Sequence, residues 1–72
     1  MSQYHFSRKM KQLRVQHGIT QKNLARKLGV SKTAISNYEN ENSLPSIQKL
    51  IAAANVFGVS VEYLLCGTTI NA

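Results

Sequence analysis

Gly29 divides the stretch QKNLARKLGVSKTAISNYEN into two short segments, each with the apolar spacing of a helix. Thr20 and Ser31 stand immediately before these segments, where a hydroxyl side chain favours the start of a helix. Glycine adopts the left-handed backbone conformation that ends a helix without the steric cost that a Cβ atom brings. We therefore predict two helices joined by a tight turn, over residues 21–28 and 32–40, in place of one long helix.

Apolar residues lie at each point where these two helices would meet each other and a core, namely Leu24, Leu28, Val30, Ile35 and Tyr38. Ala25 is small where the second helix would cross close over the first. Two short helices joined through a glycine turn are the signature of a helix-turn-helix element. An ordinary corner between two helices of a small bundle is the alternative interpretation of the same spacing.

Helical patterns also occupy the rest of the chain. Phe6, Met10 and Leu13 share one helical stripe that Gly18 ends, which predicts a helix over residues 4–17. Ser46 precedes a predicted helix over 47–57, and Ser60 precedes a short one that carries Val61, Leu64 and Leu65. For the helix over 47–57 we expect the inward residues to be Ile47, Leu50, Ile51, Ala54 and Phe57. The predicted fold is all-α, a compact five-helix single domain over 1–72 with an ordered core of about 4–66 and a tail at 67–72.

Positive charge is concentrated in the first half of the chain. The net charge is +6, and eight of the nine basic residues lie between Arg8 and Lys32, whereas the three acidic residues all follow Lys32. This segregation favours a polyanionic partner. Nucleic acid is favoured over a membrane surface, because no segment combines these charges with a broad apolar face, and no apolar run approaches the ~20 residues of a membrane span.

The sequence lacks the residue groupings of an enzyme or a metalloprotein. It has two histidines and one cysteine, and we find no nucleophile–base set, paired carboxylates or glycine-rich phosphate loop. We therefore expect no catalysis, no cofactor, no metal and no small-molecule ligand. Cys66 cannot form an internal disulfide and is interpreted as an apolar filler, and His17 as a residue of a helix's last turn. Cysteine usage predicts a cytoplasmic location.

At this point the chain resembles the lambda-repressor and Cro-like helix-turn-helix family, also called the XRE family. The resemblance rests on KQLRVQHGITQKNLARKLGVSKTAISNYEN and LPSIQKLIAAANVFGVSVEYLL and extends from about Phe6 to Leu65. The chain is especially similar to the small Cro proteins of lambdoid phages and to the DNA-binding domains of phage repressors. The resemblance implies five helices, with the second helix of the motif placed in the major groove of operator DNA.

Family roles transfer to individual positions of this chain. Gln21 matches a glutamine that contacts a phosphate and braces the recognition helix, and Arg14 and Glu39 match a charged pair that ties the first helix to the end of the third. Many members have glycine where this chain has Glu41. That departure leaves the loop geometry open, and with it the phosphate contacts that we expect from Asn40 and Asn42.

The polar face of the second motif helix gives the same interpretation from its residues alone. If Ile35 and Tyr38 face inward, four short or flexible polar side chains face outward and could reach base edges: Lys32, Thr33, Ser36 and Asn37. A merely solvated helix face is the alternative. The predicted phosphate contacts, which position the protein without reading sequence, are Gln21, Lys22, Lys11, Arg26, Asn40 and Asn42.

The predicted function is sequence-specific binding of double-stranded operator DNA by a Cro-like repressor. One such module reads few base pairs, so we expect a homodimer, formed either in solution or only on DNA. Its predicted contact surface consists of Val59, Val61, Tyr63 and Leu44. Two alternatives stay open: an antitoxin-like or coactivator-like protein-interaction module with secondary DNA binding, and a nucleic-acid binder that uses charge alone.

Overall fold

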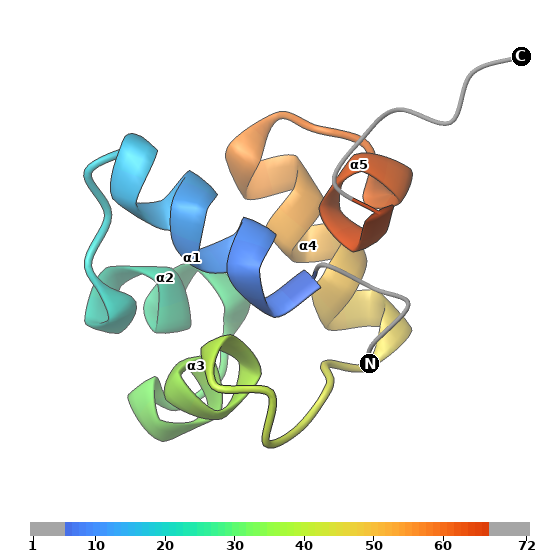
Figure 1. Cartoon of the computed structure of the whole chain (residues 1–72). Coiled ribbons are helices and arrows are strands. Elements are labelled where there is room, and N and C mark those ends of the chain that lie inside the picture. Colours follow the sequence, from blue (N-terminus) through green and yellow to red (C-terminus); the bar gives the residue numbers. More distant parts are fainter. Residues whose placement is uncertain (1–5, 67–72) are drawn as a thin grey trace, which may run out of the picture.

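The computed structural model describes residues 6–66, and every regular element within this range is a helix. The five helices are α1 (Phe6–Gln16), α2 (Gln21–Leu28), α3 (Lys32–Glu39), α4 (Ile47–Phe57) and α5 (Val61–Cys66). In Figure 1, α3 lies at the lower edge of the molecule against α2 and α1, while α5 lies on the far side beside α4. The predicted all-α, five-helix fold is confirmed. The tail predicted at 67–72 lies outside the described residues.

A hydroxyl side chain caps the start of four helices. The Oγ1 atom of Thr20 accepts a hydrogen bond of 3.1 Å from the backbone N–H of Asn23, and the Oγ atom of Ser31 accepts one of 3.0 Å from Ala34. Ser46 and Ser60 make the same contact with Lys49 and Tyr63, at 3.3 and 3.0 Å. Each cap satisfies a backbone donor that the first turn of a helix leaves without a partner. These caps confirm the four predicted helix starts.

The first four helices end in one common hydrogen-bonding pattern. At the end of α2, Gly29 donates to the carbonyl of Arg26 at 3.3 Å and Val30 donates to the carbonyl of Ala25 at 3.0 Å. This pair of bonds requires that the residue after the helix adopt the left-handed backbone conformation, and Gly29 does so with φ 72°. Gly18 and Gly58 serve α1 and α4 in the same way. After α3 the left-handed residue is Glu41, with φ 63°.

Glu41→Gly is expected to stabilise the protein. Glu41 donates to the carbonyl of Tyr38 at 3.4 Å and Asn42 donates to that of Asn37 at 2.8 Å, so the backbone needs the left-handed conformation here. Because glycine adopts this conformation without steric cost, the free energy of unfolding should rise by about 1 kcal/mol. The measurement is urea unfolding followed by circular dichroism.

Glu41→Ala separates the backbone effect from the loss of charge. It removes the carboxylate but keeps a Cβ, so the free energy of unfolding should stay within about 0.5 kcal/mol of the original. Gly58→Ala tests the reverse change, since Gly58 has φ 68° and an added Cβ would meet nothing within 4 Å. It should destabilise the protein by about 1 kcal/mol. Equal stability of the Glu41→Gly and Glu41→Ala proteins would contradict the explanation.

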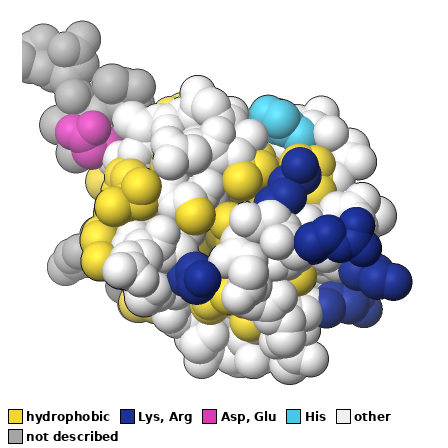
Figure 2. Space-filling model, turned by 180° about the vertical axis from the view of Figure 1, so that it is seen from behind, with side chains coloured by type: hydrophobic (Ala, Val, Ile, Leu, Met, Phe, Trp, Pro, Cys, Tyr) yellow, Lys and Arg dark blue, Asp and Glu magenta, His cyan; other side chains and the backbone are white. Residues whose placement is uncertain are grey.

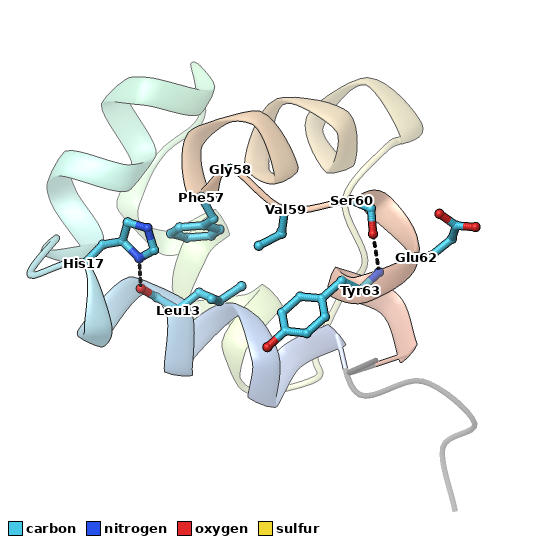
Figure 3. Close-up of a pocket in the computed structure, with 8 residues that line it drawn as sticks. All are labelled: Leu13, His17, Phe57, Gly58, Val59, Ser60, Glu62 and Tyr63. Carbon is cyan, nitrogen blue, oxygen red and sulfur yellow. Dashed lines mark hydrogen bonds between the residues drawn. The ribbon is translucent and has the colours of Figure 1, made fainter. Parts of the chain in front are cut away.

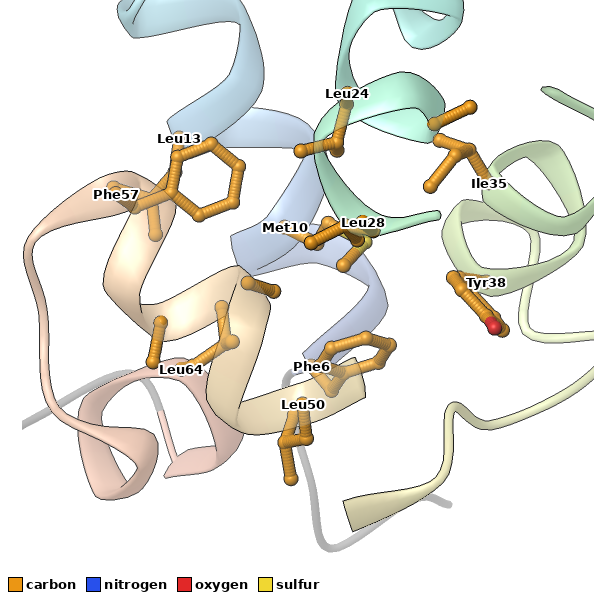
Figure 4. Close-up of a cluster of buried hydrophobic side chains, with 13 residues drawn as sticks. Phe6, Met10, Leu13, Leu24, Leu28, Ile35, Tyr38, Leu50, Phe57 and Leu64 are labelled. Carbon is orange, nitrogen blue, oxygen red and sulfur yellow. The ribbon is translucent and has the colours of Figure 1, made fainter. Parts of the chain in front are cut away.

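One apolar core joins all five helices (Figure 4). Side chains of α1 and α4 enclose it, α2 and α3 close one side, and Leu64 of α5 closes the other. The buried set is Phe6, Met10, Leu13, Leu24, Ala25, Leu28, Ile35, Tyr38, Leu50, Ala53, Ala54, Phe57 and Leu64. It contains the predicted apolar positions of the two motif helices, and Val30 packs partly buried against it. The rings of Phe6 and Tyr38 meet edge to face, with centroids 6.3 Å apart.

The predicted inward face of α4 was partly wrong. Ile47 and Ile51 are 64% and 47% exposed, whereas Ala53, which was not predicted, is fully buried. The sequence of α4 is IQKLIAAANVF, which is apolar around most of its circumference. More than one helical stripe therefore fits it, and apolar spacing alone does not identify the buried one. Close contact with the neighbouring helices instead selects the stripe that contains the small residues Ala53 and Ala54.

The first helix ends one residue earlier than predicted. Residues 4 and 5 of the predicted helix lie outside the described range, and His17 lies in the turn after α1. Its ring nitrogen Nδ1 is 2.9 Å from the carbonyl oxygen of Leu13, and the ring lies 5.4 Å from that of Phe57, centroid to centroid. His17 therefore closes the end of the helix locally. Cys66, interpreted as an apolar filler, is a free, half-buried residue at the end of α5.

Candidate nucleic-acid interface

Helix α3 presents a polar face on the side opposite its buried residues. Ile35 is fully buried and Tyr38 is 7% exposed. Lys32 and Thr33 are exposed, and Ser36 and Asn37, one turn further along the helix, are half-buried. Residues at these positions share one helical face. The structure thus brings together the four predicted base-contact residues, Lys32, Thr33, Ser36 and Asn37.

Ser36 and Asn40 are not independent of each other. The side-chain amide of Asn40 donates a hydrogen bond of 3.2 Å to the hydroxyl oxygen of Ser36. The hydroxyl proton of Ser36 keeps its rotational freedom and can still be donated outward. A residue predicted to contact phosphate and one predicted to contact bases therefore form a single hydrogen-bonded pair in the protein without DNA.

A part-buried ion pair fixes the C-terminal end of α3 to α1. Arg14 donates from Nε to Oε2 of Glu39 at 2.6 Å and from Nη2 to Oε1 at 3.2 Å, a two-bond contact. The Arg14 side chain is 13% exposed and that of Glu39 is 2% exposed. Arg14 also donates to the carbonyl of Ile19 at 3.0 Å. The charged pair predicted from the family resemblance is present, and it links α1, α3 and the turn before α2.

Gln21 joins the same network from the first turn of α2. Its side-chain amide donates to Oε1 of Glu39 at 3.1 Å. Gln21 is half-buried, so it lies between the ion pair and the molecular surface. Gln21 therefore contacts the C-terminal end of α3 directly, through Glu39.

Most of the residues predicted to contact phosphate lie on the surface. Lys11, Lys22 and Arg26, all predicted to contact phosphate, are exposed, as are Asn40 and Asn42 around the end of α3. Figure 2 shows Lys and Arg side chains gathered along one edge of the molecule. Lys9 is different, since its ammonium lies 4.8 Å from the centre of the Tyr63 ring and 3.4 Å from its hydroxyl. It therefore connects α1 to α5.

The sequence reasoning missed the role of Lys49. Its ammonium donates a hydrogen bond of 2.9 Å to the carbonyl oxygen of Leu28, the last residue of α2. Lys49 is half-buried and belongs to α4. A signal was present, because Lys49 is the only basic residue after Lys32 and stands within an otherwise uncharged helix.

The four residues predicted for a dimer contact fall on different surfaces. Val59 and Tyr63 line a groove of about 430 Å³ between α1 and the turn that joins α4 to α5 (Figure 3). Val61, which lies between these two residues in the sequence, is partly buried and packs against the core. Leu44, 71% exposed, lines a separate apolar pocket of about 220 Å³ together with Phe6, Pro45, Leu50 and Leu65.

Two further features are absent from residues 6–66. No group of three or more His, Cys, Asp or Glu side chains in this range could hold a metal ion. None of its helices is long and apolar enough to cross a membrane.

Comparison with known proteins adds independent evidence. A family model described as Helix-turn-helix, HTH_3, matches residues 10–64. The uncharacterized HTH-type transcriptional regulator YobD of Bacillus subtilis is 37% identical over 60 residues, which are 83% of this chain and 54% of YobD. The chain thus spans about half the length of the first curated relatives that it matches, since it covers 53% of a second one, YqaE of the same organism.

Solved structures of similar fold include two determined with DNA. The P22 c2 repressor in complex with a synthetic operator superposes with a TM-score of 0.84 and 30% identity, over 88% of this chain and 96% of that one. SinR, a Bacillus subtilis regulator of biofilm formation, was solved in complex with DNA. It has a TM-score of 0.75 and 37% identity, over 82% of this chain and 95% of that one.

Proposed function

Because the chain belongs to the helix-turn-helix family, we propose that it is a transcriptional regulator that binds double-stranded operator DNA in a sequence-specific manner. One observation carries the proposal: the polar face of α3 points outward, while α3 itself is fixed to α1 and α2 by buried side chains. A rigid helix with short polar side chains is the element that major-groove recognition requires. The P22 c2 repressor, a structure of the same fold, was solved on an operator.

In this proposal the four outward residues of α3 read base edges. The amide of Asn37 can pair with adenine through two hydrogen bonds, and the ammonium of Lys32 can donate to the O6 and N7 atoms of guanine. Thr33 can use its hydroxyl or touch a thymine methyl group, and Ser36 can donate its hydroxyl proton. Each well-placed contact would contribute about 1–3 kcal/mol of discrimination between bases.

Phosphate contacts would come from residues around this face. We assign them to the six predicted residues, Gln21, Lys22, Lys11, Arg26, Asn40 and Asn42. The first turn of α2 suits an anion, since its backbone N–H groups and helix dipole favour negative charge. These contacts would position the protein on the duplex and make its affinity depend on salt.

We further propose that the chain acts as a Cro-like repressor of phage type, in the bacterial cytoplasm and associated with the nucleoid. Two copies would bind half-sites about 34 Å apart, one turn of DNA. The chain itself extends 36 × 26 × 22 Å, so copies at that spacing would lie in contact or nearly so. The groove lined by Val59 and Tyr63, with Val61 beside it, is the proposed contact surface, and Leu44 would contribute from a separate position. Occupied operator DNA would then be closed to polymerase.

Selection of bound sites from random duplex DNA tests the proposal. A dyad-symmetric consensus with half-sites one helical turn apart is expected, because each α3 would read one half-site. A consensus without symmetry would contradict the dimer but keep sequence-specific binding. Recovery of random sequences, with scrambled duplexes competing equally well, would contradict the proposed function and favour a binder that uses charge alone.

A further inference from the structure

The turn between α2 and α3 receives a side chain from a helix that is distant in sequence. Lys49 of α4 reaches the end of α2 and donates its ammonium to the Leu28 carbonyl at 2.9 Å. A Cβ atom added at Gly29 would lie 3.5 Å from the same ammonium, so the charge sits directly against the turn. A cation near the C-terminal carbonyls of a helix is favourable, both as a hydrogen-bond donor and through the helix dipole.

This contact matters because of how α3 is held. Helix α3 packs mainly on α2 and α1. Its C-terminal end is tied to α1 by the ion pair of Arg14 with Glu39. At its N-terminal end, α3 continues directly from the turn that Gly29 forms, through Val30 and the cap Ser31. The orientation of that end therefore depends on how firmly the turn is fixed to the rest of the domain, and Lys49 makes that connection from α4.

We infer that Lys49 is a positioning residue for DNA recognition, which fixes the turn from which α3 starts and so the angle of its polar face. The inference rests on the proposed DNA-binding function. It assigns to Lys49 a role unlike that of the exposed basic residues, because its ammonium is already bonded to a carbonyl and half-buried. Lys49 should therefore affect the choice of sequence without contributing a phosphate contact.

Three variants test the assignment. Lys49→Met keeps the apolar stem and removes the ammonium, Lys49→Arg keeps a cationic donor, and Lys27→Met removes a charge from an exposed position in the last turn of α2. All are compared with the original protein at a temperature where circular dichroism shows each fully folded. Affinity for a selected operator and for a scrambled duplex is measured over a series of salt concentrations, and amide hydrogen exchange is followed in α3.

Lys49→Met should lower the ratio of operator affinity to scrambled-duplex affinity roughly three- to tenfold. Its salt slope should stay unchanged, exchange in α3 should be faster, and Lys49→Arg should restore most of the ratio. Lys27→Met should leave both the ratio and the exchange in α3 unchanged.

Two results would overturn the assignment: an unchanged ratio with unchanged exchange in α3, or a salt slope smaller by about 0.9 for each bound protomer, which would indicate a lost phosphate contact. If the original protein did not discriminate between duplexes, the proposed function would fail, while hydrogen exchange would still decide whether Lys49 fixes α3.

Discussion

Arg14→Met is expected to lower the free energy of unfolding by about 3 kcal/mol, because it leaves the Glu39 carboxylate buried without its cation. The Glu39 side chain is 2% exposed, and its remaining contact is a single hydrogen bond of 3.1 Å from the uncharged amide of Gln21. In a domain of this size the melting temperature should fall by roughly 12–24 °C. Thermal and urea unfolding followed by circular dichroism measure both quantities.

Two controls separate the effect of the part-buried pair from a general effect of charge. Arg8→Met removes an exposed arginine from the same helix and should change the free energy of unfolding by less than about 0.5 kcal/mol. Adding Glu39→Gln to Arg14→Met should recover part of the loss, since an amide needs no counter-charge. A double variant no more stable than Arg14→Met alone would show that the loss does not come from an unpaired carboxylate.

Asn37→Ala is expected to reduce discrimination between the selected operator and duplexes changed at one base pair by about 1–3 kcal/mol, roughly 5- to 150-fold. The loss should be confined to one base pair in each half-site, because one side chain reads one base edge. Alanine favours helix, so α3 should stay folded. Fluorescence anisotropy with a set of single-base-pair variants of the operator measures the effect.

Lys22→Met is the matched control for Asn37→Ala. Lys22 is exposed at the start of α2, and its proposed partner is a phosphate. Its replacement should weaken binding to all duplexes alike and reduce the slope of log affinity against log salt by about 0.9 for each bound protomer, while preserving the base preference. If Asn37→Ala instead weakened all duplexes equally, the assignment of Asn37 to base reading would be wrong.

The helix boundaries could be predicted because they depend on contacts between residues close in sequence. Ser31 caps a backbone donor three residues ahead, and Gly29 supplies a left-handed conformation that few other residues adopt. Glu41 shows the limit of this rule: the same turn forms after α3 without glycine, because the bonds from Glu41 and Asn42 hold it. Glu41 departs from the family pattern in the sequence, but its backbone conformation could be described only from the structure.

Burial was predicted well where the apolar stripe is narrow and poorly where it is broad. In α2 and α3 the other faces carry charged and polar side chains, so only the face with Leu24 and Leu28, or with Ile35, could be inward. In α4 nearly every face is apolar, and Ile47 and Ile51 were misplaced. Which stripe of such a helix is buried depends on the shape of the helices packed against it, and that shape is a property of the tertiary structure.

The sequence by itself determined the five helices, the turn at Gly29 and the polar residues on the outer face of α3, since each follows from local spacing and backbone preference. Only the tertiary structure decided what fixes that face in place. Arg14 and Glu39 are 25 positions apart, and Lys49 is 21 positions from Leu28. From its residue type alone, Lys49 would be predicted to be an ordinary charged residue on the surface. The fold brings its ammonium to the open carbonyl at the end of α2, where a hydrogen bond gives it a specific place.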